Sequence, residues 1–289
     1  MRRIVALAIG MSLLAGFAGP AQACDRECLR GSITVFLDAL LKHDTSQLPL
    51  AGQVRITEDS ELKNIDKVGL VRSVTKVRSY RQDFIDERQG VAGSHVLVEE
   101  SGAPVLLVLR LKIAGGKITE IETVATRSRA DGAIFNIDAL DRPSEAMSHV
   151  PKPEQLTARA EAARIALLYP AGLEAGSFVE VDVPFTADAF RFENGAVMAG
   201  PDCKLNEGCK NIKTQPLGNV NRGKVSRRVA AVDERLGIVW LRMEWNTRGG
   251  KRLAVWEAFK IYDGKIHAVE AFMKLLPDGL GSGWADRET

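Results

Sequence analysis

Carboxylates between apolar neighbours are the residues of this 289-residue chain best suited to chemistry. Glu122 and Glu270 lie 148 residues apart in β-prone apolar runs, and Glu193 follows a short run rich in phenylalanine. An apolar environment raises the pKa of a carboxyl group, which can then exchange a proton near neutral pH. These three glutamates are therefore candidate general bases for a carbon acid. The structural alternatives are an ion pair or an exposed strand end for Glu122 and Glu270, and a tight turn through Asn194 for Glu193.

Histidine is the other candidate for proton transfer. His95 and His267 fall in predicted strands, where either could move a proton near neutral pH. They are not equivalent in the repeat described below, because the residue 147 positions after His95 is Arg242, and a structural role is the alternative for both. The chain has no H-x-x-x-H or H-x-H spacing, so no metal site is predicted. It also lacks the G-x-S-x-G and dinucleotide-binding glycine patterns, which excludes a serine hydrolase of that type and a nicotinamide enzyme. No cofactor is expected.

Other residues are predicted to hold a ligand. Arg110 and Arg242 lie within apolar runs, where a guanidinium group needs a carboxylate from the protein or from an acidic ligand. Trp240 and Trp256 offer flat walls for a pocket, and packing in the core is the alternative. Further predicted ligand contacts are Glu58, Arg191 and Asn194.

These candidates belong to a chain that repeats itself. The pattern D-E-R-x-G between two apolar, β-prone runs begins at Asp86 and again at Asp233, and G-K-I begins at Gly116 and Gly264. The two offsets are 147 and 148 residues. Landmarks kept at nearly one offset predict a duplicated domain. Each D-E-R-x-G pattern predicts a hairpin whose glycine adopts a positive φ.

Each half is predicted to contain a helix followed by an antiparallel sheet, which is a fold of the α+β class. Apolar residues three and four apart mark a helix over 29–43, and a proline suited to the first turn opens a second helix over 153–170. The predicted strands are 54–56, 74–85, 90–99, 104–113 and 117–126, then 189–192, 225–233, 237–246, 252–262 and 265–275, with an insertion at 194–224. The predicted segments are a signal peptide at 1–23, repeats at 24–128 and 154–276, a linker at 129–153 and a tail at 277–289 that Trp284 anchors.

Charge and composition limit the partners. Lys and Arg number 39 against 37 Asp and Glu, a net charge of +2, and aromatic residues make up 6%. A nucleic-acid binder usually carries a basic patch or stacking aromatic residues, so no nucleic-acid partner is predicted. A basic start at residues 1–3, an apolar run at 4–17 and an A-x-A site at 21–23 predict export, to a periplasm or to the outside. The apolar run is too short to span a membrane comfortably, and a lipoprotein anchor at Cys24 is the alternative.

Export favours disulfides for the four cysteines. They form two local pairs in the sequence, Cys24 with Cys28 and Cys203 with Cys209. Four cysteines allow three connectivities, and local pairing is favoured because residues 204–208 form a polar, glycine-containing loop that closes easily. A zinc site is the alternative, although C-x3-C and C-x5-C are loose spacings for zinc.

A set of short motifs carries a family resemblance. The motifs are Cys24-Asp25-Arg26, His43-Asp44, Leu48-Pro49-Leu50, Thr57-Glu58, Arg191-Phe192-Glu193-Asn194-Gly195, Cys209-Lys210-Asn211, Val232 to Trp240, Val269-Glu270-Ala271-Phe272 and Gly283-Trp284. Together with the helix-then-sheet order, they resemble the SnoaL-like, nuclear-transport-factor-two-like fold, and more closely an exported fungal and bacterial family of unsettled function with two such repeats. The resemblance covers nearly all of the mature chain. It implies two cone-shaped domains, helices over the concave face of each sheet, packed as an intramolecular pseudo-dimer.

Two classes of function follow from this resemblance. A cavity with an apolar wall and a few polar groups is typical of small-molecule sites. The first class is a cofactor-free isomerase, cyclase or lyase that uses a carboxylate or a histidine, and the second is a non-catalytic ligand-binding or protein-interaction module. The second repeat is expected to hold the pocket, with Glu193 and Glu270 as its acidic groups and a small apolar or acidic molecule as its ligand. Catalysis itself and the oligomeric state stay open.

Overall fold

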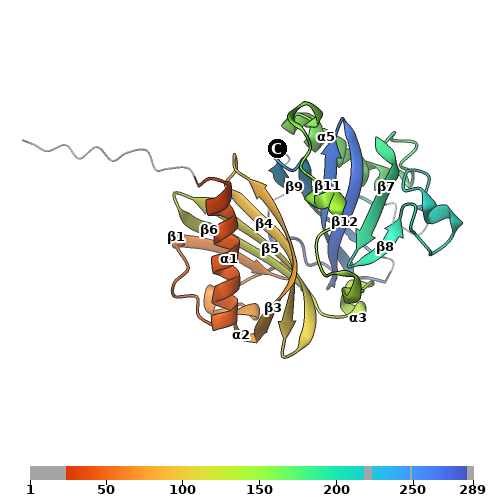
Figure 1. Ribbon diagram of the computed structural model, residues 1–289. Coiled ribbons are helices and arrows are strands. Elements are labelled where there is room, and N and C mark those ends of the chain that lie inside the picture. Colours follow the sequence, from red (N-terminus) through yellow and green to blue (C-terminus); the bar gives the residue numbers. More distant parts are fainter. Residues whose placement is uncertain (1–23, 218–222, 248, 285–289) are drawn as a thin grey trace, which may run out of the picture.

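The computed structural model describes residues 24–217, 223–247 and 249–284, so the predicted signal peptide lies outside the described residues. Each half of the chain runs from a 17-residue helix through six strands (Figure 1). The first half contains α1 (Arg26–Lys42), β1 (Leu50–Glu58), β2 (Glu61–Leu62), η1 (Ile65–Lys67), α2 (Leu70–Ser73), β3 (Val74–Asp86), β4 (Val91–Glu100), β5 (Ala103–Ala114) and β6 (Lys117–Thr126). The linker contains α3 (Arg129–Gly132), η2 (Ile137–Ala139), α4 (Glu145–Ser148) and η3 (Pro153–Gln155). The second half contains α5 (Arg159–Ala175), β7 (Phe185–Glu193), β8 (Ala196–Ala199), η4 (Glu207–Lys210), β9 (Ser226–Asp233), β10 (Ile238–Asn246), β11 (Arg252–Tyr262) and β12 (Lys265–Leu276).

The two halves build sheets with the same topology. The strand orders are β2-β1-β6-β5-β4-β3 and β8-β7-β12-β11-β10-β9, so each strand has a counterpart at the same place in the other sheet. In both sheets the first strand runs parallel to the last, and the other long strands form an antiparallel meander. The fold is therefore mixed α+β with two similar domains, as the repeated patterns predicted.

One long helix packs on one face of each sheet and closes the core of that domain. Leu29, Ile33 and Phe36 of α1 are fully buried against the first sheet. Ile165 and Tyr169 of α5 are buried in the same way against the second sheet. Their spacing of three or four residues places them on one helical face, which is why burial of that face fixes each helix on its sheet.

The second helix differs from its prediction at both ends. Residues 153–155 form a separate 3-10 turn, so the predicted start at the proline is wrong, and α5 begins at Arg159. The predicted stop at Pro170 is also wrong, because α5 continues to Ala175. A proline inside a helix costs a backbone hydrogen bond. Burial of the apolar face of α5 on both sides of Pro170 offsets that cost.

The sheet faces turned away from the helices pack against each other, so a third apolar core lies between the repeats. Trp240 is fully buried there, with its ring 4.4 Å from the ring of Trp256 and 4.9 Å from that of Phe84. A Cβ atom added at Gly93 would lie 2.2 Å from the Trp240 ring. The absence of a side chain at Gly93 therefore lets the two sheets approach closely at this point.

Two buried aspartates join the repeats by reciprocal contacts. Asp233 accepts hydrogen bonds from Nη1 and Nη2 of Arg26, both at 2.8 Å, and one at 3.0 Å from the backbone N–H of the residue before Asp86. Asp86 accepts from Arg159 at 3.0 and 2.5 Å, and at 2.9 Å from the backbone N–H of the residue before Asp233. Both carboxylates are fully buried. The repeated D-E-R-x-G pattern thus marks a pseudo-symmetric contact between the domains.

The glycine of each D-E-R-x-G pattern closes its hairpin as predicted. Gly90 and Gly237 have φ values of +62° and +61°. A Cβ atom at these positions would lie 2.4 and 2.6 Å from the carbonyl oxygens of Ile113 and Ile261, on the neighbouring strands. Both the positive φ and the close backbone approach therefore require glycine.

Both predicted disulfides are present. Cys24 pairs with Cys28 at the start of α1, and Cys203 pairs with Cys209 in the insertion between β8 and β9. No cysteine of the described residues is free, which rules out the zinc alternative for these thiols. Trp284 anchors the tail on the first domain, where its indole N–H donates to the Thr57 hydroxyl at 2.9 Å. No described helix combines the length and the apolar content needed to cross a bilayer.

Candidate functional site

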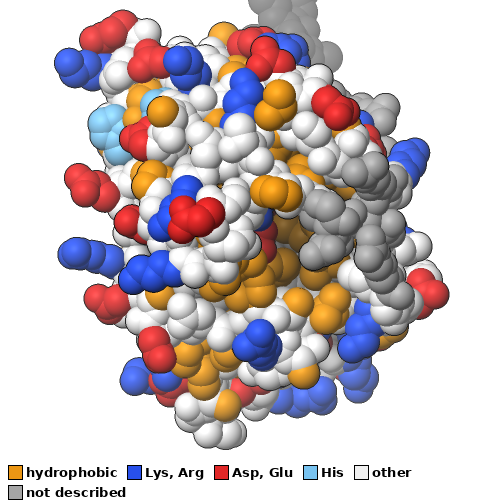
Figure 2. All heavy atoms as spheres, turned by 90° about the vertical axis from the view of Figure 1, so that its right-hand side faces the viewer, with side chains coloured by type: hydrophobic (Ala, Val, Ile, Leu, Met, Phe, Trp, Pro, Cys, Tyr) orange, Lys and Arg blue, Asp and Glu red, His pale blue; other side chains and the backbone are white. Residues whose placement is uncertain are grey.

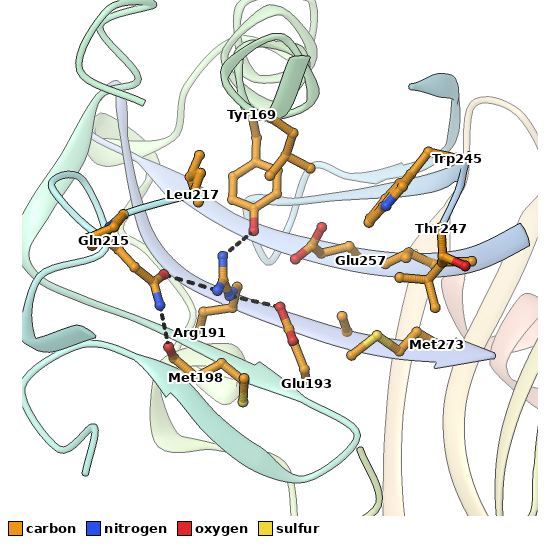
Figure 3. Close-up of a pocket in the computed structure, with 15 residues that line it drawn as sticks. Tyr169, Arg191, Glu193, Met198, Gln215, Leu217, Trp245, Thr247, Glu257 and Met273 are labelled. Atoms are coloured by element: carbon orange, nitrogen blue, oxygen red, sulfur yellow. Dashed lines mark hydrogen bonds and ion pairs between the residues drawn. The ribbon is translucent and has the colours of Figure 1, made fainter. Parts of the chain in front are cut away.

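A cavity of about 480 Å³ lies between α5, the inner face of the second sheet and the insertion that follows β8. The same face of the molecule is hollowed, with apolar side chains around the hollow (Figure 2). Six polar side chains, those of Tyr169, Arg191, Glu193, Gln215, Thr247 and Glu257, belong to a wall that is otherwise mostly apolar (Figure 3). A wall of this kind is typical of small-molecule sites. The lining residues are Tyr169, Leu173, Arg191, Glu193, Met198, Gln215, Pro216, Leu217, Trp245, Thr247, Leu253, Val255, Glu257, Ala271 and Met273.

Arg191 is the centre of the polar groups in this cavity. Its Nη1 donates to the Tyr169 hydroxyl at 2.8 Å and its Nη2 donates to Oε1 of Gln215 at 3.0 Å. Its Nε lies 2.9 Å from Oε1 of Glu193 and forms an ion pair with it. Each of the three guanidinium nitrogens thus has one protein partner, so Arg191 positions the side chains of Tyr169, Gln215 and Glu193. Tyr169 keeps its own hydroxyl hydrogen to donate elsewhere.

Glu257 is the group that the sequence predictions missed. It is 3% exposed and lies on β11 in register with Ala271 of β12, which is in turn in register with Glu193 of β7. The small alanine between them leaves room above the sheet between the two carboxyl groups. Burial and the charge of Glu193 together raise the pKa of Glu257 to about 8, while Arg191 and Tyr169 act in the opposite direction. Glu257 is therefore protonated at neutral pH, next to a carboxylate that is ion-paired.

The first repeat provides an internal comparison for this cluster. The strand registers place Leu109 where Glu257 stands and Ile56 where Arg191 stands. Phe36 is the eleventh residue of α1, as Tyr169 is of α5. Leu109, Ile56 and Phe36 all belong to the buried core of the first repeat. The fold can thus be built with apolar residues at these positions, so stability alone does not explain a buried polar cluster in the second repeat.

Glu193 and Glu270 do not share a cavity, which corrects the prediction that they are the acidic groups of one pocket. Glu270 is in register with Phe192, and Glu193 with Ala271. Neighbouring residues of a strand point to opposite faces, so Glu193 faces α5 and Glu270 faces the first repeat. Burial raises the pKa of Glu270 to about 7, and it lines a separate cavity next to the linker.

His95, Trp240 and Trp256 lie in the core between the sheets, away from the cavity, so the prediction of tryptophan pocket walls is wrong. His95 is fully buried, stacks on Phe272 at 4.4 Å and accepts a hydrogen bond at its Nε2 from the Trp240 indole at 3.2 Å. Burial lowers the pKa of His95 to about 3. His95 therefore stays neutral, and its role is packing. The tryptophan that does line the cavity is Trp245.

Two further predicted groups have structural partners. His267 is half-buried, stacks on Tyr262 at 3.5 Å and lies 3.2 Å from the carbonyl oxygen of that residue, outside the cavity. Asn194 is fully buried, and its side chain bonds to both the N–H and the carbonyl of Met273, at 2.8 and 2.9 Å, and to the carbonyl of Ile134. The amide of Asn194 therefore joins the turn after β7 to β12 and the linker, and this replaces its predicted contact with a ligand.

The predicted arginine ligands are paired within the protein. Arg110 contacts Glu120 at 2.8 Å and Glu122 at 3.7 Å. Glu122 is therefore an ion-paired carboxylate, which was the structural alternative to its predicted role as a general base. Arg242 is 2% exposed and donates to Oε2 of Glu244 at 3.0 Å and to the backbone carbonyl of the next residue. Burial lowers the pKa of Arg242. Neither arginine lines the cavity in the second repeat.

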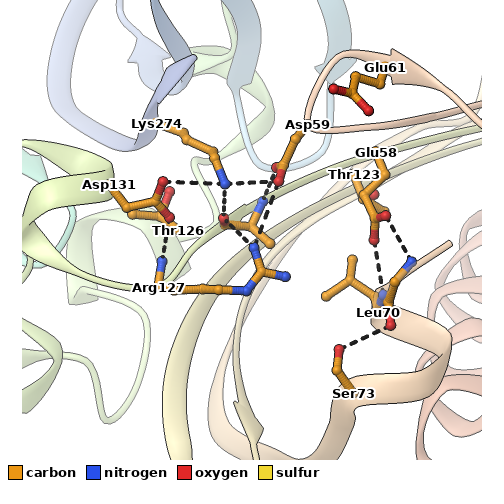
Figure 4. A network of polar contacts seen from close by, with 12 residues as sticks. Glu58, Asp59, Glu61, Leu70, Ser73, Thr123, Thr126, Arg127, Asp131 and Lys274 are labelled. Atoms are coloured by element: carbon orange, nitrogen blue, oxygen red, sulfur yellow. Dashed lines mark hydrogen bonds and ion pairs between the residues drawn. The ribbon is translucent and has the colours of Figure 1, made fainter. Parts of the chain in front are cut away.

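In the first repeat, Glu58 occupies the position that Glu193 has in the second repeat. Glu58 stabilises a helix. Both glutamates are in register with the same position of the last strand, Thr123 in one sheet and Ala271 in the other. The carboxylate of Glu58 accepts hydrogen bonds from the backbone N–H groups of Gly69 at 2.8 Å and Leu70 at 2.9 Å, at the start of α2 (Figure 4). A carboxylate at a helix N-terminus is electrostatically favourable. Glu58 therefore has a structural role, which replaces its predicted ligand contact.

Comparisons with known proteins locate one family match. Residues 155–273 match a family model described as a domain of unknown function (DUF8021), a region that contains Tyr169, Arg191, Glu193 and Glu257. This match is consistent with the prediction of an uncharacterised family. No curated protein matches the chain. One similar solved structure is a de novo designed protein with a curved β-sheet, at 17% identity and a TM-score of 0.28, over 35% of this chain and 86% of that chain. No group of three His, Cys, Asp or Glu side chains that could hold a metal ion occurs among the described residues.

Proposed function

We propose that the second repeat binds a small, largely apolar carbonyl compound and moves a proton on it without a cofactor, as an isomerase, cyclase or lyase does. The observation that carries the proposal is that Glu257, Ala271 and Glu193 are in register on three neighbouring strands, with Glu193 ion-paired to Arg191. Two carboxyl groups in different protonation states are what acid–base chemistry on a carbon acid requires. We also propose that each repeat has the SnoaL-like cone fold that the sequence motifs resemble. Export of the protein is a further part of the proposal, and the two disulfides support it.

The proposed step uses one carboxylate and one carboxylic acid. Glu193, ion-paired to Arg191, takes a proton from a carbon next to a carbonyl group, and the C–H electron pair becomes a C=C bond. The carbonyl oxygen takes the proton of Glu257, which gives an enol. The Tyr169 hydroxyl, whose oxygen already accepts from Arg191, favours the charged form of Glu257 as the proton leaves. Glu193 then gives its proton to the γ-carbon of a conjugated enol and the enol O–H proton returns to Glu257, which completes an isomerisation and restores both carboxyl groups.

The ligand of this cavity is proposed to be neutral. Each guanidinium nitrogen of Arg191 already has a protein partner, and the charge of Glu193 would repel an added carboxylate in a buried space. The structure therefore favours the apolar ligand of the two classes predicted from the sequence. Met198, Leu253 and Met273 supply flexible apolar contacts for such a molecule.

Hydrogen–deuterium exchange in D2O tests the function. A cyclic α,β-unsaturated ketone and its β,γ-unsaturated isomer, both neutral in the assay, serve as probes, and proton NMR follows the loss of their C–H signals. We expect Glu193→Gln to reduce protein-catalysed exchange by about 100-fold or more, the usual contribution of a general base. Glu257→Gln should reduce exchange as well, and the exposed Glu154→Gln should leave it unchanged.

Two outcomes would decide against catalysis. Exchange that persists in both Glu193→Gln and Glu257→Gln would remove these residues from the chemistry. Probe binding seen by line broadening, with no exchange above the buffer rate, would favour the alternative of a non-catalytic binding module.

A further inference from the structure

A second cavity, of about 790 Å³, lies between the repeats next to the linker segment 139–148. Tyr80 of β3 comes from the first repeat, and Phe192 of β7 and Glu270 of β12 come from the second. Because Glu270 and Glu193 face opposite sides of the second sheet, this cavity is separate from the site described above.

Glu270 is a buried carboxyl group that lacks a full set of partners. The residue is 6% exposed, and no hydrogen bond reaches its Oε1 within the part of the chain that the structure describes. Its Oε2 lies 3.5 Å from the Tyr80 hydroxyl, a long hydrogen bond, and the Ser144 hydroxyl is also close. No cation of the described residues forms an ion pair with it. A buried carboxyl in this condition is costly unless a ligand completes it.

The equivalent carboxylate of the first repeat shows what such a position binds. Glu122 accepts two hydrogen bonds from Nη2 of Arg228, at 3.0 and 2.8 Å, and lies 3.7 Å from Nη1 of Arg110. The guanidinium carbon of Arg228 lies 5.6 Å from the ring centre of Trp256 and 5.8 Å from that of Trp284. An organic cation of the protein, Arg228 from the second repeat, thus lies against this carboxylate, near two aromatic rings.

The second repeat has the carboxyl group and aromatic rings without the cation. Register places Ala258 where Arg110 stands in the first repeat, and Phe192 where Thr57 stands. Tyr80, from the opposite repeat, approaches Glu270 as Arg228 approaches Glu122. Neither Ala258 nor Tyr80 is a cation. No arginine of the described residues therefore neutralises Glu270 as Arg228 and Arg110 neutralise Glu122.

Charge around the cavity favours a positive ligand. The linker contributes Asp141, Arg142 and Glu145 to the lining, and all three are exposed. With Glu270 and Tyr80, these are the titratable or charged side chains that face the cavity from β3, β12 and the linker. Three carboxyl groups against one guanidinium group attract a cation.

We propose that the cavity between the repeats binds a small organic ammonium ion, with Glu270 as its counter-ion and Tyr80 and Phe192 as its aromatic walls. The proposal is independent of the carbon-acid function proposed above, because the two cavities share no lining residue.

Binding should depend on pH in a defined direction. Burial raises the pKa of Glu270 to about 7, and the pKa of Tyr80 is also raised, so Glu270 is the group that changes charge between pH 5.5 and pH 8. An ammonium ion binds the ionised carboxylate, of which about 3% is present at pH 5.5 and about 90% at pH 8 for a pKa near 7. Affinity is therefore expected to rise about 30-fold over this range.

Isothermal titration calorimetry with three matched probes tests the site. Benzylamine is expected to bind at pH 8, with benzyl alcohol and benzoate at least 10-fold weaker. Glu270→Gln keeps the shape, removes the charge and should weaken benzylamine binding by 10-fold or more. Phe192→Leu, which removes one aromatic wall, should weaken it by about 3-fold. Glu257→Gln, in the other cavity, and the exposed Glu154→Gln are the controls and should leave it unchanged.

Equal affinity for the three probes would overturn the proposal, as would unchanged benzylamine binding in Glu270→Gln. Near-ultraviolet circular dichroism confirms that each variant is folded. Should Glu270→Gln not fold, Phe192→Leu and the pH dependence of the unaltered protein decide the question. Affinity that does not rise between pH 5.5 and pH 8 would then exclude Glu270 as the counter-ion.

Discussion

The reciprocal aspartate contacts make a prediction that can be worked from the structure. Asp233→Asn replaces a fully buried carboxylate that receives two hydrogen bonds from Arg26, one from the backbone of Ile85 and one from that of Leu236. An asparagine of the same shape offers one oxygen and turns an N–H2 group toward donors. Breaking one side of a buried ion pair costs about 3–5 kcal/mol. We therefore expect the free energy of unfolding to fall by about that amount.

Urea denaturation followed by tryptophan fluorescence measures this change. The exposed Glu154→Gln is the control, because Glu154 takes no part in either aspartate contact. Asp86→Asn, on the other side of the pseudo-symmetric contact, should match Asp233→Asn. If the repeats then unfold separately, each transition should have a smaller dependence on urea than that of the intact protein. A loss below about 1 kcal/mol in both aspartate variants would refute a stabilising role for the contacts.

Three further changes test other parts of the account. Because the pKa of Glu257 is about 8 when folded and near 4.5 when unfolded, its contribution to stability is lost as pH rises through that window. Between pH 5 and pH 8, the free energy of unfolding of Glu257→Gln, measured by urea denaturation, should therefore rise by up to about 4 kcal/mol relative to that of the unaltered protein. If the two proteins show the same dependence of this free energy on pH, the prediction is contradicted. Gly93→Ala should destabilise the fold by about 1–3 kcal/mol in the same assay, since the added methyl group overlaps the Trp240 ring, and an unchanged midpoint would show that the sheets can separate. Glu58→Ala should cost about 1–3 kcal/mol by removing two hydrogen bonds at the start of α2, whereas no loss would return Glu58 to the candidate ligand contacts.

Local patterns predicted the repeat and its elements well. The hairpin glycines, Gly90 and Gly237, and the alternating apolar runs depend on short-range sterics and burial, which a single sequence carries. The disulfides followed in the same way from the local spacing of the cysteines. The predicted bounds of the second helix are wrong because a proline need not start or stop a helix, and burial of the helical face retains Pro170 inside α5.

The candidate site was predicted only in part, because both faces of each sheet are buried. Alternation then identifies two faces without showing which one lines a cavity, and for this reason Glu193 and Glu270 were assigned to one pocket. Trp240 and Trp256 were misplaced for the same reason. Glu257 could have been found by aligning the repeats, since it is a charged residue where the first repeat has leucine at the buried position 109.

Carbon-13 NMR of the glutamate side-chain carboxyl groups measures the protonation of Glu257 beside Glu193 directly. We expect one resonance that titrates near pH 8 and disappears in Glu257→Gln, and a second that titrates near pH 7 and disappears in Glu270→Gln. In Glu193→Gln the titration of Glu257 should move to lower pH, because a neighbouring negative charge is removed. A spectrum in which every glutamate titrates below about pH 5.5 would contradict the account, since ordinary exposed glutamates titrate near 4.3.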